Sequence, residues 1–411
     1  MKKLTLFIMA VLLVMVGWLV YSYFWPTPDQ PIENLPEETP LTVVEPPPVQ
    51  PPLQKQKTDG TVLFEQGKYE DAIEQLQDEL SGRQVEDPAR HLSYLAVCYD
   101  RLNKPAQALE TWDKIITTNS ASPYCAQAYF EKGRFDKDRT KRIEFFEKVV
   151  AGFPESSWAQ AAGSELGDYY FDLLDPERAY KSRHFYSLAL RGKLAQKDEK
   201  RIKESLSQLN QKLVFSTMPA PDSKIYVVKP GDTLWKISRE FKVEAGSEDV
   251  NGKTVPGHIK RINGLKTGNI FPGDKIKIIT GKSHLEVSKT NFTMKLYFNG
   301  DFIKEYSIAV GHPKENPTPV GTFHITGKTS YPPWTKRDEK GTEVIPYGDS
   351  RNVLGTRWMS FRENPRFGIH GTTDPKSIGQ AVTNGCVRMY NRDVEELYDL
   401  IPEDTEIIIS D

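Results

Sequence analysis

The chain has few cysteines, almost no net charge and no metal-binding pattern, and each of these absences excludes a class of protein. Only three cysteines, Cys98, Cys125 and Cys386, occur in 411 residues, which excludes a disulfide-rich scaffold. No two of them form a CxxC pair, so a zinc ribbon is excluded as well. Lys and Arg total 54 against 56 for Asp and Glu, so no basic field indicates binding to nucleic acid. We therefore expect neither a metal site nor a nucleic-acid partner.

An uncharged apolar run covers residues 4–25, directly after Lys2 and Lys3. The run is long enough to cross a bilayer, which takes ~20 apolar residues in a helix. The run ends in bulky aromatic residues rather than in the small residues of a cleavage site, which favours an uncleaved signal anchor over residues 1–25. A cleaved signal peptide is the alternative. Because the two lysines favour a cytoplasmic amino terminus, we expect a single-pass membrane protein whose remainder lies outside the cytoplasm.

The next two segments differ sharply in composition. Residues 26–57 are rich in proline and acidic residues, which predicts a disordered, extended linker. Residues 58–217 follow the pattern of amphipathic helices, and Ala72 and Ala108 occupy equivalent places in similar phrases 36 residues apart. This spacing resembles that of tetratricopeptide repeats. A stack of such helices could bind a protein partner or serve only as a spacer, and the sequence supports both roles equally.

Cys98 and Cys125 both fall on these expected helices. We interpret them as two small buried thiols of the helical core. A disulfide between them is the alternative, permitted in an oxidising envelope.

Residues 224–280 contain the phrases YVVKPGDTLWKISREF and INGLKTGNIFPGDKIKII. They resemble the LysM module, a βααβ unit that binds glycans containing N-acetylglucosamine. The resemblance implies glycan-binding module residues at Gly231, Asp232, Thr233, Leu234, Asn263 and Gly273. We expect Asp232 to cap the first helix. A long connection over 244–262 departs from the pattern, and a degenerate copy kept as a spacer is the alternative.

From about residue 284 the apolar pattern changes to a period of two, which predicts a compact and mainly antiparallel β domain over 284–411. Asn299-Gly300 between two strand-like runs predicts a type I′ hairpin turn. A polar segment at 328–350 interrupts the strands, and it is either a lid over a substrate or a simple surface loop. Residues 391–401 should form a short helix that packs behind the site described next.

Four phrases within this β domain stand in a recognisable order: TPVGTFHI, NVLGTRWMSF, IHGT and TNGCVRM. His370 lies in the third and Cys386 in the fourth. Together they resemble the YkuD-like L,D-transpeptidase catalytic domain. A thiol is a weak nucleophile at neutral pH unless a base takes its proton, and His370 is the candidate base for Cys386.

The resemblance also implies supporting roles around these two residues. The carbonyl of Gly371 would orient the imidazole, and Arg388 would hold the donor peptide or brace the site. Gly385 lets the backbone approach the substrate, and its N–H with that of Cys386 could form an oxyanion hole. The expected site residues are therefore Cys386, His370, Gly385, Gly371, Thr383 and Arg388.

Two further expectations concern the thiol. The family often carries Ser-His-Gly-Cys at this point, whereas the chain has Asn384 in place of that histidine, so no role that needs a second titrating ring is available. We also expect the imidazolium of His370 to lower the pKa of Cys386, so that alkylation proceeds well below pH 8.5.

The sequence thus predicts a multidomain, membrane-anchored L,D-transpeptidase that needs no cofactor and acts at the cell wall on peptidoglycan stem peptides and glycan strands. The thiol would form a thioester with one stem and pass it to an amine on another. An L,D-carboxypeptidase that uses water as the acceptor is one alternative. A non-catalytic wall-binding scaffold is the other.

Overall fold

The computed structural model describes residues 59–82, 85–241, 254–338 and 341–411. The expected membrane anchor at 1–25 and linker at 26–57 lie outside these residues. Within the described residues, no helix has both the length and the apolar character needed to cross a membrane. Residues 58–411 form one compact unit.

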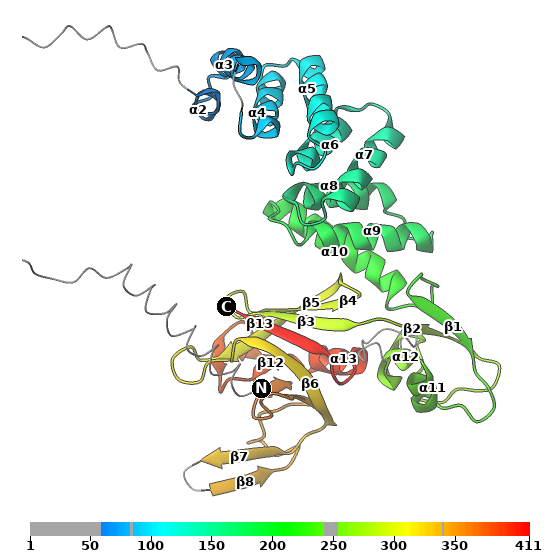
Figure 1. Ribbon diagram of the computed structural model, residues 1–411. Coiled ribbons are helices and arrows are strands. Elements are labelled where there is room, and N and C mark those ends of the chain that lie inside the picture. The colour runs from blue at the N-terminus through cyan, green and yellow to red at the C-terminus, as the bar shows by residue number, and fades with distance from the viewer. Residues whose placement is uncertain (1–58, 83–84, 242–253, 339–340) are drawn as a thin grey trace, which may run out of the picture. The chain divides into compact units, whose positions relative to one another are not determined.

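The amino-terminal part of this unit is entirely helical (Figure 1). Asp or Ser side chains cap several of these helices, such as Asp87 for α4 and Ser156 for α8, so their ends follow directly from the sequence. The helical prediction is confirmed. The helices are α2 (Gly60–Glu65), α3 (Tyr69–Gly82), α4 (Pro88–Arg101), α5 (Pro105–Thr118), α6 (Tyr124–Phe135), α7 (Arg139–Gly152), α8 (Ser157–Tyr170), α9 (Pro176–Ala189) and α10 (Gln196–Leu213).

Cys98 and Cys125 are buried in a core shared by α3, α4, α5 and α6. Both are free thiols, and within the described residues neither forms a disulfide. Burial raises the pKa of Cys98 to about 11 and raises that of Cys125, as expected for inert packing residues.

A small βααβ module follows, as expected. It consists of β1 (Ser223–Val227), α11 (Leu234–Glu240), α12 (Pro256–Ile262) and β2 (Lys275–Ile279). The two strands pair antiparallel around a core that includes Ile237, Ile259 and Ile276. The long connection therefore still ends in a second helix, although its residues 242–253 lie outside the described part.

The expected cap of α11 is wrong by one residue. Thr233 is the N-cap and accepts a hydrogen bond from the Lys236 amide. Asp232 instead accepts from the Lys229 amide and from the Tyr226 hydroxyl, at 2.8 and 2.7 Å. The reason is that the helix begins at Leu234, so Asp232 lies too early and closes the preceding turn.

The carboxy-terminal β domain is built on one sheet whose strand order is β11-β5-β12-β10-β9-β6-β13-β3-β4. A further pairing of β4 with β5 closes this order into a ring. Most described pairings are antiparallel, and β10–β12, β11–β5 and β13–β3 are parallel. The strands are β3 (Ser283–Ser288), β4 (Thr293–Phe298), β5 (Asp301–Gly311), β6 (Gly321–Ser330), β9 (Arg357–Phe361), β10 (Gly368–His370), β11 (Ala381–Thr383), β12 (Val387–Met389) and β13 (Glu406–Ser410).

Two local features of this domain follow from short sequence signals. Asn299 and Gly300 both have positive φ, 51° and 79°, and form the two-residue turn between β4 and β5 that was predicted. The helix expected near 391–401 is α13 (Asn391–Leu400), which buries Val394, Leu397 and Leu400 in the core of the sheet.

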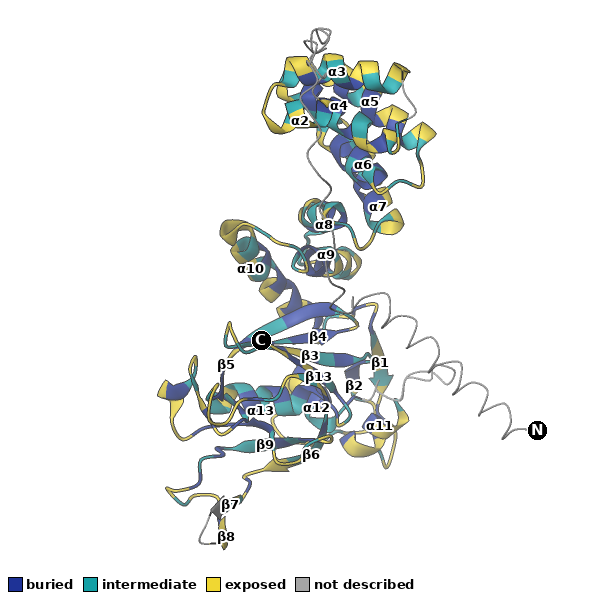
Figure 2. Ribbon diagram, turned by 60° about the vertical axis from the view of Figure 1, so that its left-hand side comes forward, coloured by how far each residue is buried: buried dark blue, intermediate teal, exposed yellow. Residues whose placement is uncertain are grey.

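The polar segment between β6 and β9 is not a simple loop, and its role as a lid over a substrate stays a prediction. It forms a two-stranded hairpin, β7 (Trp334–Asp338) and β8 (Gly341–Ile345). Figure 2 shows that β8 is largely exposed, whereas buried residues concentrate on the strands of the main sheet. Only Ile345, at the end of β8, is buried.

Helices α9 and α10 share one core with the sheet rather than continuing only the helical stack. Their buried residues Tyr186, Leu206 and Leu213 belong to the same cluster as Leu285 and Phe302. The expected helical repeat region thus ends in helices that also pack on the β domain (Figure 1).

A fully buried arginine connects these parts. Arg183 on α9 is 0% exposed and donates to Asp222, just before β1, at 2.7 Å and to Asp301, at the start of β5, at 3.2 Å. His184 also contacts Asp301 at 2.9 Å. The positive charge of one helix is therefore neutralised by carboxylates from the βααβ module and from the β domain.

A buried lysine makes a second connection. Lys277 on β2 donates to the carbonyls of Leu213 at 2.5 Å, of Ser216 at 3.2 Å and of Met218. Leu213 is the last residue of α10, and the other two follow it. Burial lowers the pKa of this lysine to about 8. The end of α10 and the closing strand of the module are thus held together by charge-assisted hydrogen bonds.

Replacing Arg183 with methionine should lower the free energy of unfolding by about 3–5 kcal/mol, because it leaves two carboxylates buried without their partner. The measurement is chemical denaturation of residues 58–411. Lys114→Met is the matched control, since its pair with Glu110 is exposed on both sides, and should change little. Equal effects of the two substitutions would contradict a stabilising role for the buried pair.

Candidate active site

The two expected catalytic residues lie on neighbouring strands. β10 ends at His370, and β12 begins just after Cys386, with Ile369 paired to Val387 and His370 paired to Arg388 in parallel register. The pairing of these two short strands therefore brings together residues 16 positions apart in the chain. Cys386 lies beside Gly368, whose backbone hydrogen-bonds to the thiol.

The ring of His370 is held by a backbone carbonyl. Its Nδ1 lies 2.7 Å from the carbonyl oxygen of Gly371, which is the contact that the resemblance implied. A carbonyl oxygen can only accept, so Nδ1 carries the proton and donates it, and Nε2 is left to accept a proton from a neighbour. The imidazole is 3% exposed and lies 6.0 Å, between ring centroids, from Trp358 on β9.

Burial favours the neutral forms of both candidate catalytic groups. Desolvation and, to a smaller degree, the nearby Arg388 guanidinium lower the pKa of His370 to about 4, and the hydrogen bond to the Gly371 carbonyl opposes this shift. Burial also raises the pKa of Cys386 to about 11. The expectation of a lowered thiol pKa is therefore wrong, because a desolvated pocket disfavours both members of a thiolate–imidazolium pair.

The turn that carries Cys386 depends on glycine. Gly385 has φ +100°, and a Cβ built there would lie 2.3 Å from the Phe367 ring. On the other side, a Cβ on Gly311 would lie 2.8 Å from the Gly385 Cα. Thr383 closes the turn, since its hydroxyl donates to the carbonyl of Cys386 at 2.6 Å. The thiol is thus presented on a tightly packed turn that other residues could not form.

Arg388 lies beside the catalytic pair with part of its hydrogen-bonding capacity unused. Its Nη1 donates to the Ser377 hydroxyl at 2.9 Å, and the carboxylate of Asp374 is close enough to affect its pKa. The buried Nε has no hydrogen-bond partner among the described residues. A guanidinium N–H without a partner can donate a hydrogen bond to an oxygen of a bound peptide. Asn384, in place of the family histidine, is exposed and 3.5 Å from Asn316.

Asn391 is a positioning residue that the sequence analysis did not identify. Its Oδ1 accepts from the amides of Thr372 at 2.9 Å and Thr356 at 3.3 Å, and its Nδ2 donates to the Thr372 carbonyl at 2.8 Å. A Cβ on Gly371 would lie 2.1 Å from this Oδ1. The asparagine therefore fixes the backbone that carries the carbonyl facing His370. In the sequence, Asn391 stands at the start of an amphipathic helix. That position indicates a helix terminus and gives no sign of a contact with the backbone near His370.

The residues expected to bind glycan lie in the βααβ module in structural roles. Gly231 and Gly273 have positive φ, 82° and 94°, in the turns that follow β1 and precede β2. Leu234 is buried in the module core. Asn263 donates from Nδ2 to the Lys277 carbonyl and accepts the Lys277 amide, both at 2.8 Å, and so joins the end of α12 to β2. Asp232 and Thr233 order the turn before α11, as described above.

Asn391→Ala should lower kcat by roughly 10- to 100-fold with little change in KM, because the Gly371 carbonyl would no longer hold the Nδ1 proton of His370. Asn391→Asp keeps both accepted hydrogen bonds and should recover part of kcat. Arg392→Ala, an exposed neighbour on the same helix, is the control. A purely structural effect would lower thermal stability in both Asn391 variants without the difference in kcat.

The rate of alkylation of Cys386 by iodoacetamide should rise steadily between pH 7 and pH 10, because the pKa of this half-buried thiol lies above this range. Intact-mass measurement in Cys98→Ala/Cys125→Ala protein isolates the signal. A plateau reached below pH 8 would instead show a preformed thiolate.

Comparisons with known proteins identify the family of this chain. A family model of the L,D-transpeptidase catalytic domain, YkuD, matches residues 282–409, and the LysM domain model matches residues 226–278. A Bacillus licheniformis protein named "Putative L,D-transpeptidase YkuD" is 32% identical over 193 residues, which cover 45% of this chain and 98% of the relative. The Bacillus subtilis protein of the same name is 32% identical over 189 residues, again 45% of this chain and 98% of the relative. The chain therefore belongs to the YkuD family of L,D-transpeptidases, and it carries a LysM domain directly before the catalytic domain.

Proposed function

We propose that this L,D-transpeptidase joins peptidoglycan stem peptides through a thioester on Cys386. The Sγ attacks the carbonyl carbon before the terminal D-residue of one stem, while its proton passes to Nε2 of His370. That proton then goes to the amine of the departing D-residue as the C–N bond breaks. An amine of a second stem attacks the thioester, gives its proton to His370, and forms the new amide as Sγ regains a proton.

The observation that carries this proposal is the hydrogen bond between His370 Nδ1 and the Gly371 carbonyl. It fixes the tautomer in which Nε2 can accept a proton. With a pKa of about 4, the imidazole is neutral at pH 7 and ready to act as a base. Because the thiol is also neutral, proton transfer accompanies the attack instead of preceding it.

Two sets of N–H groups would support the transition state. The N–H groups of Gly385 and Cys386 lie on the glycine turn and would receive the developing oxyanion. The unpartnered Nε of Arg388 would bind an oxygen of the donor stem. Thr383 holds the turn that carries both amides.

The other parts of the chain would bring the enzyme to its substrate. We propose that the LysM module binds glycan strands and raises the local concentration of stems. We also propose that residues 1–25 anchor the chain in the membrane, with 26–57 as linker and the catalytic domain outside the cytoplasm. The helices within 58–217 would serve as a docking surface for a protein or as a spacer.

Two alternative functions make different products from the same site. Water in place of the second amine would make the protein an L,D-carboxypeptidase. A non-catalytic scaffold would form no thioester at all, and the ordered His370–Gly371 contact favours a catalyst over it.

Incubation of purified tetrapeptide-containing muropeptides with residues 58–411 should yield cross-linked dimers that mass spectrometry detects. Cys386→Ala should abolish both the dimer and the thioester adduct, and His370→Ala should slow turnover by about 10²–10⁴-fold. Cys98→Ala and Cys125→Ala are matched controls, because both thiols lie in the helical core.

The fragment for this experiment must include α9, since a shorter one would leave Asp222 and Asp301 without Arg183. Tripeptide products without dimers would show the carboxypeptidase instead. Turnover that persists in Cys386→Ala would disprove the thioester mechanism.

A further inference from the structure

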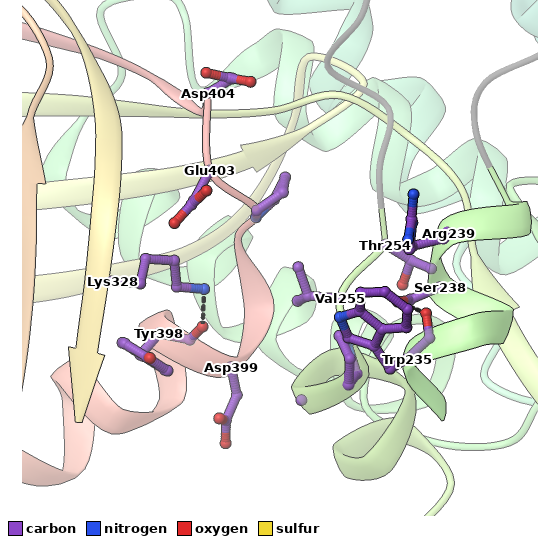
Figure 3. Close-up of a pocket in the computed structure, with 13 residues that line it drawn as sticks. Trp235, Ser238, Arg239, Thr254, Val255, Lys328, Tyr398, Asp399, Glu403 and Asp404 are labelled. Carbon is purple, nitrogen blue, oxygen red and sulfur yellow. Dashed lines mark hydrogen bonds between the residues drawn. The ribbon is translucent and has the colours of Figure 1, made fainter. Parts of the chain in front are cut away.

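A cavity of about 700 Å³ lies between the LysM module and the catalytic domain (Figure 3). Trp235, Val255 and Arg239 lie on one side of it, and Lys328 and Tyr398 on the other. Its lining includes neither Cys386 nor His370. The cavity also differs from the turns around Gly231 and Gly273 that carry the LysM resemblance. It is therefore a separate place at which the two domains could hold one ligand.

The walls of this cavity are joined by direct contacts between the domains. Arg261 on α12 donates to Asp399 on α13 at 2.7 Å. Gly257 packs so closely that a Cβ there would lie 2.9 Å from the Asp399 Cα. The cavity is thus built from parts that hold each other in place.

Two of the five charged side chains that line the cavity are held in ion pairs, and a third is held by carbonyl oxygens. Asp399 is paired with Arg261, and Asp404 is paired with Arg362. The ammonium of Lys328 donates to two carbonyls at the end of α13, at 2.5 and 2.6 Å. The other two charged side chains of the lining, Arg239 and Glu403, have opposite signs, so the cavity as a whole does not favour a strongly charged ligand.

The other side chains of the lining fit a neutral ligand that has an apolar ring face and hydroxyl groups. Trp235 is 61% exposed, and the Arg239 guanidinium lies 4.6 Å from the centroid of its indole and orients it. The hydroxyl of Thr254 is buried, at 6% residue exposure, and has no hydrogen-bond partner among the described residues. A buried hydroxyl without a partner is unfavourable, so this one indicates a missing ligand. The carboxylate of Glu403 adds an acceptor to the lining.

We infer that this cavity binds a sugar ring of a glycan strand, with the indole of Trp235 against the C–H face of the ring and Thr254 and Glu403 on its hydroxyls. The inference rests on the proposed function, in which the strand carries the stem that reaches Cys386. A ring held by both walls would fix the strand relative to the catalytic domain, whereas the LysM turns alone would only tether it.

The first test is calorimetric binding of an N-acetylglucosamine tetrasaccharide to residues 58–411 carrying Cys386→Ala. Trp235→Ala should weaken the affinity about tenfold, through loss of ring stacking. Thr254→Val, which removes only the hydroxyl, should weaken it several-fold. Phe271→Ala is the matched control, because this residue is 66% exposed in the turn before β2 and does not line the cavity.

Unchanged affinity in both cavity variants would overturn the inference. So would loss of binding in Phe271→Ala alone, because it would place the sugar on the LysM turns. Circular dichroism of each variant separates a loss of binding from a loss of folding. This binding experiment involves no turnover, so its outcome holds even if the proposed reaction is disproved.

The second test compares two substrates in protein with Cys386 intact. Trp235→Ala should raise KM about tenfold for stems attached to glycan strands, without changing kcat. Free soluble stems should be turned over at the wild-type rate, because they carry no strand to fill the cavity. An equal defect on both substrates would show that the substitution disturbs the catalytic domain, and the inference would fail.

Discussion

The buried guanidinium of Arg183 is the constraint on which the arrangement of the described domains depends. A guanidinium with 0% exposure is stable in the protein interior only when carboxylates pair with it. Here the carboxylates are those of Asp222 and Asp301. These two carboxylates stand at the first strand of the LysM module and at the start of β5. The shared core of α9, α10 and the sheet then adds apolar burial to the same junction. The result is that the LysM module and the catalytic domain are held at a common helix rather than joined only by the chain.

The same desolvation governs the chemistry at Cys386 and His370. Burial opposes charge on both groups, so the proton stays on the sulfur of Cys386 and the imidazole of His370 stays neutral. Precise placement of the imidazole then matters more than prior ionisation, and Gly371 and Asn391 supply that placement through the backbone. The start of α13 fixes this loop, while its end lines the cavity beside Trp235. One helix thus contributes both to the catalytic residues and to the domain boundary.

Much of the local structure and the identity of the reacting groups could be predicted from sequence. Asn299-Gly300 defined a hairpin because both residues accept positive φ. The helices, the βααβ order and the mainly β domain followed from apolar periodicity. The cap of α11 was misplaced by one residue, since Asp232 and Thr233 are both good caps and only the starting point of the helix chooses between them.

The sequence alone therefore predicts the helices and strands, and it also predicts the candidate nucleophile and base. It can do so because residue spacing and turn chemistry are local properties of the chain. Tertiary packing, in contrast, set the protonation of Cys386 and His370, the partners of Arg183 and the role of Asn391. Each of these depends on how completely a group is removed from water and on which distant backbone or carboxylate meets it. Such desolvation arises only when strands and helices far apart in the chain pack together, and no local pattern encodes it.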